Sequence, residues 1–322
     1  MPSRRTLLLQ MLGIGLIGAG AWPALTAAGP RAPDFTGIDG WLNTPAPLTL
    51  TALRGQVVLV DFWTYSCINC RRTVPILNQW QEIYGPDGLR IVGIHTPEFG
   101  FEQARTNVAE AVRRLGIRFP VGQDNAARTW RAWGNEAWPA FYLLDRDGRI
   151  VLTRYGEGHA RDLEAGIRAL LGLAPADAVA RDDPGLSRVA TPEIYFGALR
   201  ATPQDGSQGP SRGEATYTFP ATGPGADQYQ LDGTWDRRGE GLELRSPRGG
   251  LRLRFQAAKL HLVAAAPQPV TLRVRVDGGP ARAIEVGSPT LYTLVDGETY
   301  GEHLLAFETE GPGLTLFSAT FG

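Results

Sequence analysis

The first half of the chain alternates between short continuous apolar runs and longer segments with apolar residues at helical spacing. Residues 57–60 and 89–95 are continuous runs of the kind found in strands buried on both faces of a sheet. Four helices are predicted, over residues 67–84, 101–115, 125–134 and 160–171. A short strand at 119–121 and a hairpin, 140–145 with 149–155 around an Asp-Gly turn, complete the pattern. This order predicts a three-layer α/β domain over residues 34–172.

The pattern changes after residues 173–191, where proline, aspartate and glycine predict a linker. From residue 192 to 322, short runs alternate between apolar and polar residues and are bounded by Gly, Pro or Asp turns, and no helix is needed. Strands are predicted at 242–244, 251–255, 260–263, 270–276, 283–286, 291–295, 304–307 and 314–317. Short strands at this spacing predict an all-β sandwich as the second domain.

Chain length, net charge and the number of cysteines limit the classes of function that the protein can have. The 322-residue chain is long enough for two domains, and its net charge of -1 provides no basic surface for nucleic acid. It contains two cysteines, Cys67 and Cys70, which are too few for a disulfide framework. A bond between them would close almost no loop and would add little stability, so a chemical role is predicted.

The N-terminal residues 1–28 have the features of an export signal. Arg4 and Arg5 precede an uncharged run that ends in small residues, which resembles a twin-arginine signal cleaved after Ala28. A general secretory signal fits nearly as well, and a retained membrane anchor is the alternative. The protein is therefore expected to be periplasmic or extracytoplasmic.

The two cysteines lie where a buried strand ends and a helix begins. Unpaired backbone N–H groups and the helix dipole stabilise a thiolate at that position, so Cys67 is the predicted nucleophile and Cys70 the resolving thiol. This predicts thiol-disulfide exchange with no cofactor besides the Cys67–Cys70 disulfide. The alternative is zinc or copper, with His95 as a further ligand, although the chain lacks a second cysteine pair.

The stretch VDFWTYSCINCRRTVPIL resembles the active site of the thioredoxin superfamily. The resemblance implies that Asp61 is the buried carboxylate behind the disulfide, which accepts the proton of Cys70. It also implies that Pro75 kinks the helix and that Pro139, in the sequence WPA, is the cis-proline facing the disulfide. The alternative for Asp61 is a polar residue that merely ends the strand.

Five further side chains are expected around the cysteines. Trp63, Tyr65 and Trp138 are predicted to form the substrate groove, with Trp63 beneath the disulfide and Tyr65 partly exposed. His95 and Glu98 follow the second strand on the active-site side, where they are predicted to tune the thiols. The alternatives are core packing for the aromatic residues and a solvated loop position for Glu98. No metal site is predicted.

A longer set of motifs narrows the family. Six motifs, followed by the β-rich region, resemble the extracytoplasmic part of DipZ-type thiol-disulfide proteins. The motifs are DFWTYSCINC, GIHTPEF, QDN, WPAFYLLDRDG, YGEG and TPEIYFG. The resemblance implies a thioredoxin-like domain followed by a jelly-roll, carbohydrate-binding-module-like domain. It also implies a separate membrane electron donor or acceptor, and a glycan or envelope protein as the ligand of the C-terminal domain.

The sequence thus predicts a periplasmic thiol-disulfide oxidoreductase acting on exported thiol or disulfide proteins. One alternative is an envelope glycan- or protein-binding module whose thioredoxin-like domain is passive or carries copper. Thiol peroxidase is a minor alternative, because Thr64 lies three residues before Cys67, but Val60 replaces the proline expected for that class. Ile68 and Asn69, between the cysteines, do not specify whether the protein donates or accepts electrons.

Overall fold

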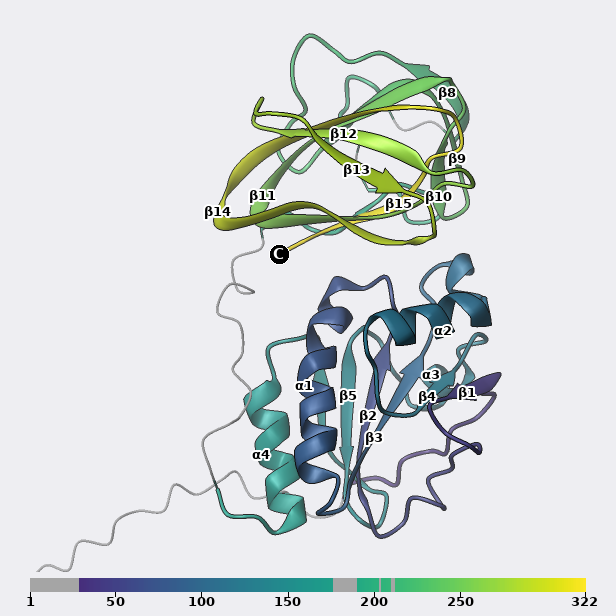
Figure 1. The fold of residues 1–322 in the computed structure, drawn as a ribbon, viewed down its shortest axis with the longest axis vertical. Helices are drawn as coiled ribbons and strands as arrows, with labels where there is room; N and C mark the ends of the chain where they lie inside the picture. The colour runs from purple at the N-terminus through teal and green to yellow at the C-terminus, as the bar shows by residue number, and fades with distance from the viewer. Residues whose placement is uncertain (1–28, 176–189, 203, 210–211) are drawn as a thin grey trace, which may run out of the picture.

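The computed structural model describes residues 29–175, 190–202, 204–209 and 212–322, which form two domains, one above the other in Figure 1. The predicted export signal and most of the predicted linker lie outside these residues. No helix in the described part of the chain has the length and apolar character needed to cross a membrane.

The N-terminal domain is built on a six-stranded sheet with the order β1-β4-β3-β2-β5-β6. Its strands are β1 (Gly40–Leu42), β2 (Val57–Trp63), β3 (Leu89–His95), β4 (Val121–Gln123), β5 (Ala140–Leu144) and β6 (Ile150–Tyr155). Its helices are α1 (Ile68–Tyr84), the 3-10 turn η1 (Gly100–Gln103), α2 (Arg105–Arg114), α3 (Arg128–Ala132) and α4 (Ala160–Leu171). Strand β2 is parallel to β3 and antiparallel to β5.

The alternation of side chains along β2 separates two apolar layers. Val57, Leu59 and Trp63 pack in one cluster with residues of α1, α2 and α4. The intervening residues of β2 face the opposite side, where α3 and the segment before β2 cover them. All seven residues of β2 are buried, as a continuous apolar run requires. The expected three-layer, thioredoxin-like domain is confirmed.

Several predicted element limits are wrong. The predicted helix 101–115 is interrupted by the extended backbone of Ala104, which separates η1 from α2. The predicted helix 125–134 is shortened to α3, because Ala127 has a left-handed backbone and Asp124 accepts hydrogen bonds from the first turn. The predicted strand 119–121 is displaced to β4. Strand β1 was not predicted, and it pairs with β4 at the edge of the sheet.

The C-terminal domain is all β, as predicted, with nine strands in its described residues. They are β7 (Ile194–Tyr195), β8 (Gly213–Tyr217), β9 (Tyr229–Arg238), β10 (Gly241–Leu244), β11 (Arg248–Ala265), β12 (Val270–Val276), β13 (Arg282–Val286), β14 (Thr290–Glu310) and β15 (Thr315–Phe321). Strands β11 and β14 each join two runs that were predicted as separate strands. The first half of β11 pairs with β9 and its second half with β15, so the sheet folds over on itself.

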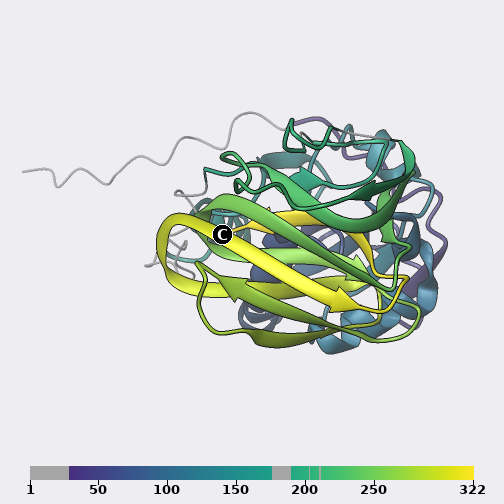
Figure 2. The same ribbon diagram turned by 90° about the horizontal axis from the view of Figure 1, so that it is seen from above.

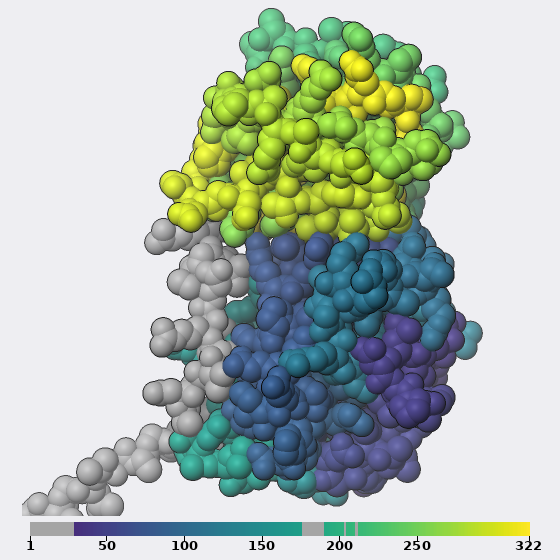
Figure 3. Space-filling model, in the orientation of Figure 1, coloured from purple at the N-terminus to yellow at the C-terminus, as the bar shows by residue number. Residues whose placement is uncertain are grey.

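The C-terminal domain covers the end of the N-terminal domain at which α1 begins (Figures 1 and 3). Viewed from above, its strands lie in front of the N-terminal helices (Figure 2). An apolar interdomain cluster joins the two domains and consists of Ile68, Phe99, Phe101, Tyr195, Val263, Leu291 and Phe317. The ring of Phe317 lies 4.7 Å from that of Phe101 and 5.4 Å from that of Phe99.

Hydrogen bonds flank the interdomain cluster. Gly100 donates its backbone N–H to Glu240 at 2.7 Å. The Glu98 carboxylate accepts from the Tyr195 hydroxyl at 2.8 Å and from Arg200 at 2.9 Å. Apolar contacts and directed polar bonds together fix the C-terminal domain on the N-terminal domain.

We expect Phe317→Ala to lower the free energy of unfolding by about 2 kcal/mol, because it removes a partly buried ring from the interdomain cluster. Urea unfolding followed by tryptophan fluorescence and circular dichroism measures the change. The control is Leu199→Ala, which truncates a side chain that is 74% exposed and should change the free energy by less than about 0.5 kcal/mol. Equal unfolding curves for the two variants would contradict a stabilising interface.

Candidate active site

Cys67 occupies the junction between β2 and α1. Strand β2 ends at Trp63, a short loop follows, and Cys67 is the N-cap residue of α1. The Cys67 Sγ accepts a hydrogen bond from the backbone N–H of Cys70 at 3.3 Å. Cys67 is partly exposed and Cys70 is buried, and both are free thiols in this structure. The arrangement presents one sulfur to solvent at the positive end of a helix and keeps the second directly behind it.

Asp61 lies on the face of β2 that α1 covers. The residue is 1% exposed, and one of its oxygens, Oδ1, has no hydrogen-bond partner among the residues that the structure describes. Burial therefore raises the pKa of Asp61 from its usual value near 3.8 to about 8. A carboxyl with that pKa exchanges its proton near neutral pH, as a proton acceptor for a thiol must.

Cys70 shares this environment with Asp61. Burial is the largest cause that raises the pKa of the Cys70 thiol well above its usual range, followed by its interactions with Cys67 and then the charge of Asp61. The Cys70 thiol is thus protonated at neutral pH and needs an acceptor for its proton before it can attack. Asp61 is the carboxyl whose charge acts on it.

Pro139 follows a cis peptide bond after Trp138. The Trp138 carbonyl oxygen lies 3.9 Å from the Cys67 Sγ, which brings this loop to the nucleophile across 71 positions of sequence. The Trp138 indole packs on the ring of Trp130 at 4.4 Å and is only partly exposed. Trp138 therefore borders the cysteine through its backbone, while its ring faces the neighbouring aromatic residue.

Trp63 and Tyr65 do not line an open groove. Both are 1% exposed, so the expectation that Tyr65 is partly exposed is wrong. The Tyr65 hydroxyl donates to the carbonyl of Pro289 at 3.4 Å, and its ring packs on His95 and Phe101, so both domains contribute to covering this side chain. Trp63 packs against His95 in the core.

His95 and Glu98 occupy different environments. The His95 ring is fully buried and stacks on Tyr65 at 5.7 Å, and burial lowers its pKa to about 3, so it is neutral at physiological pH. No group of three or more His, Cys, Asp and Glu side chains suited to a metal ion occurs among the residues that the structure describes. Glu98 lies at the domain interface with Tyr195 and Arg200 rather than in a solvated loop.

Glu102 is a site residue that the sequence pattern did not single out. Its buried carboxylate accepts from the backbone N–H of Ser66 at 3.1 Å and from the Ser66 hydroxyl at 2.7 Å. The second oxygen accepts from the N–H groups of Glu98 and Phe99 at 2.7 and 3.0 Å. Glu102 thus fixes the residue directly before Cys67. The single local signal was an acidic residue after the apolar stretch Phe99–Phe101.

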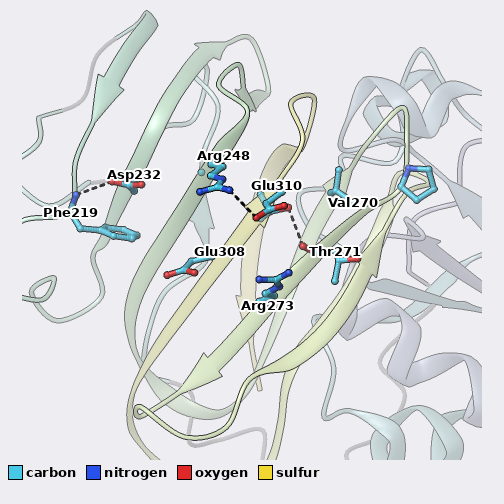
Figure 4. Close-up of a pocket in the computed structure, with 11 residues that line it drawn as sticks. Phe219, Asp232, Arg248, Val270, Thr271, Arg273, Glu308 and Glu310 are labelled. Atoms are coloured by element: carbon cyan, nitrogen blue, oxygen red, sulfur yellow. Dashed lines mark hydrogen bonds and ion pairs between the residues drawn. The ribbon is translucent and has the colours of Figure 1, made fainter.

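A second concave surface lies on the C-terminal domain (Figure 4). It encloses a cavity of about 690 Å³, lined by polar and charged side chains of several strands with Phe219 at one end. Arg248 and Glu310, which are paired on the adjacent strands β11 and β14, approach to 3.6 Å, and Arg273 and Glu308 also line the cavity. Its lining includes no residue of the cysteine site.

Two family models match this chain, one in each domain. Residues 27–171 match the Redoxin family model, and residues 191–322 match the model described as the thioredoxin-like C-terminal domain. Protein DipZ of Mycobacterium bovis is 36% identical over 300 residues, which are 90% of this chain and 43% of that protein. The chain thus spans less than half the length of this relative.

Smaller relatives resemble the N-terminal domain alone. The thiol-disulfide oxidoreductase ResA of Geobacillus thermodenitrificans is 29% identical over 146 residues, 45% of this chain and 78% of ResA. The solved structure of a putative thiol:disulfide interchange protein DsbE from Chlorobium tepidum is 29% identical and covers 45% of this chain and 99% of its own, with a TM-score of 0.41.

We expect Asp61→Asn to gain stability relative to wild type as the pH rises. The pKa of Asp61 is higher in the folded protein than in the unfolded chain, so protonation of Asp61 favours the folded state. This contribution to stability is complete below about pH 4 and is lost as the pH rises toward 8. The variant lacks this titration. The difference in the free energy of unfolding between variant and wild type should grow by about 3 kcal/mol between pH 5 and pH 8.

Urea unfolding at both pH values measures this difference. The control is Asp147→Asn, which removes an exposed acid in a turn and should give a nearly constant difference from wild type. A constant difference for Asp61→Asn as well would show that the carboxyl has an ordinary affinity for its proton.

Proposed function

We propose that this protein, whose two halves belong to the Redoxin and thioredoxin-like C-terminal domain families, exchanges disulfides with exported proteins through Cys67 and Cys70. The observation that carries the proposal is the pairing of a partly exposed sulfur at the start of α1 with a buried thiol and the buried carboxyl Asp61. Relatives named as thiol-disulfide oxidoreductases support the reaction class.

The reaction proceeds in two exchanges. The Cys67 thiolate attacks one sulfur of a substrate disulfide, forms a mixed disulfide and releases the first substrate thiolate. Cys70 then transfers its proton to Asp61 and attacks the Cys67 sulfur, which releases the second substrate thiolate. The product is an oxidised Cys67–Cys70 pair and a substrate reduced by two electrons. The reverse sequence oxidises a substrate dithiol.

The surrounding residues assist these steps without entering them. The backbone N–H of Cys70 points at the Cys67 sulfur and stabilises negative charge there. The Trp138–Pro139 loop borders the same sulfur. Glu102 holds the loop before Cys67 in place through Ser66. We propose an extracytoplasmic location, where a separate membrane electron donor or acceptor restores the starting redox state.

Single-cysteine variants test this function directly, because the chain has no other cysteine. Cys67→Ala should slow the reduction of insulin disulfides at least about a hundredfold, since the accessible nucleophile is lost. Cys70→Ser should accumulate a mixed disulfide with the substrate, visible as a mass shift that dithiothreitol removes. Wild-type rates in Cys67→Ala, or a mixed disulfide formed through Cys70 in that variant, would contradict the assigned roles.

The cavity of the C-terminal domain supports a second candidate function, binding of a glycan. Arg273, Glu308 and Glu310 provide donors and acceptors for hydroxyl groups, and Phe219 offers one apolar ring. The bound glycan would hold the redox domain near the envelope. This binding does not depend on the cysteines.

We expect Arg273→Ala to weaken the binding of cell-wall glycan fragments about tenfold in titration calorimetry, because it removes a charged donor from the cavity. Arg275→Ala is the matched control on the same strand, since Arg275 does not line the cavity and donates to Gly279. Absence of binding by the wild-type protein, or equal losses of affinity in the two variants, would contradict the proposal that this cavity binds a glycan.

A further inference from the structure

Three consecutive residues of the C-terminal domain lie against the cysteine site. The carbonyl of Pro289 accepts from the Tyr65 hydroxyl at 3.4 Å, and the Thr290 Oγ1 accepts from Arg114 at 2.8 Å. The carbonyl of Leu291 accepts from Arg71 at 3.2 Å. This segment precedes and begins β14, and Thr290 is 8% exposed. The C-terminal domain therefore forms one border of the cysteine site.

Arg71 and Arg114 are held without carboxylate partners. Neither forms an ion pair within 4 Å in the described part of the chain, whereas their sequence neighbours do: Arg72 pairs with Glu157 and Arg113 with Glu110. Their acceptors in the C-terminal domain are a neutral hydroxyl and a neutral carbonyl. Two guanidinium groups fixed by adjacent residues and lacking a counter-charge form a site for an anion.

The two arginines also lie close to the nucleophile and to one another. Arg71 follows Cys67 by one helical turn, and its N–H donates to the Cys67 carbonyl at 3.1 Å. Burial lowers the pKa of Arg71, the nearby charge of Arg114 lowers it further, and the charge of Cys67 opposes both. Arg71 is half-buried and Arg114 is exposed, so an approaching substrate can reach them.

Resting on the proposed disulfide exchange, we propose that Pro289–Leu291 completes the substrate site and holds Arg71 and Arg114 to recognise an acidic side chain beside the bridging cysteine of a substrate. The occupant is a protein segment with an acidic side chain, because Arg71 and Arg114 have only neutral acceptors and no ion pair among the described residues. The acidic side chain supplies the missing counter-charge, and its cysteine then lies within reach of Cys67.

Two peptides that differ in charge alone test this selectivity. Each carries one cysteine in a disulfide with 2-mercaptoethanol, flanked by aspartate in one peptide and by lysine in the other. The full chain, reduced beforehand, is mixed with each peptide, and the rate of disulfide cleavage is measured at low and high salt. We expect the aspartate peptide to react about tenfold faster at low salt, with a smaller ratio at high salt because ions screen the attraction.

Variants then assign the selectivity to residues. Arg114→Gln should reduce the rate ratio to less than about threefold, and Arg113→Gln, which makes the same change of charge at the neighbouring position, should leave it near the wild-type value. Thr290→Val removes the acceptor of Arg114 from the C-terminal domain and should also reduce the ratio. Thr216→Val, at an exposed threonine on β8, is its control. Thermal unfolding confirms that each variant is folded.

The outcomes separate this inference from the proposed function. Equal rates for the two peptides with the wild-type protein would overturn the inference and leave disulfide exchange intact. An unchanged ratio in both Arg114→Gln and Thr290→Val would also overturn it. Failure of the reduced wild-type protein to cleave either peptide would overturn the proposed function itself.

Discussion

The catalytic loop and the domain interface depend on the hydrogen bonds that the buried Glu102 carboxylate accepts. One oxygen binds Ser66, directly before the nucleophile, and the other binds the N–H groups of Glu98 and Phe99, which contact the C-terminal domain. Hydrogen bonds to a charged acceptor contribute about 1.5–3 kcal/mol each, so these four oppose the cost of burying the charge, although burial still raises the pKa of Glu102. The nucleophile and the interface are therefore anchored to the same carboxylate.

Asp61 and Glu102 show how surroundings give one chemical group two functions. Burial raises the pKa of both carboxyls, but only Glu102 has backbone and hydroxyl donors that oppose this effect. Asp61 keeps an oxygen without a partner and titrates near neutral pH. The carboxyl with few partners is suited to proton transfer, and the one with many is suited to holding backbone in place.

The local part of the site was predictable from the sequence, because strand, loop and helix start follow one another in the chain. The placement of Asp61 under α1 follows from the alternation of side chains along β2. Pro139 lies 72 positions from Cys67, and the resemblance to a family, rather than any local pattern, directed attention to it.

The remaining features depend on contacts that no local pattern encodes. The Tyr65 hydroxyl bonds to Pro289, 224 positions away, and the Glu102 carboxylate bonds to Ser66, 36 positions away. Strands β11 and β14 were predicted in pieces because bulges near Ala257 and Leu260 interrupt their regular alternation. A pattern with period two detects regular strand segments but not their continuation through an irregularity.

The interdomain cluster also bears on how this domain pair can evolve. Ile68, Phe99 and Phe101 belong to the catalytic domain, yet their apolar surfaces pack against residues of the second domain. A descendant that lost the C-terminal domain would present these side chains to water beside its reactive cysteine, and self-association would follow. Loss of the second domain would therefore favour polar residues at these three positions of the first domain. One of the three is Ile68, which lies between the two cysteines.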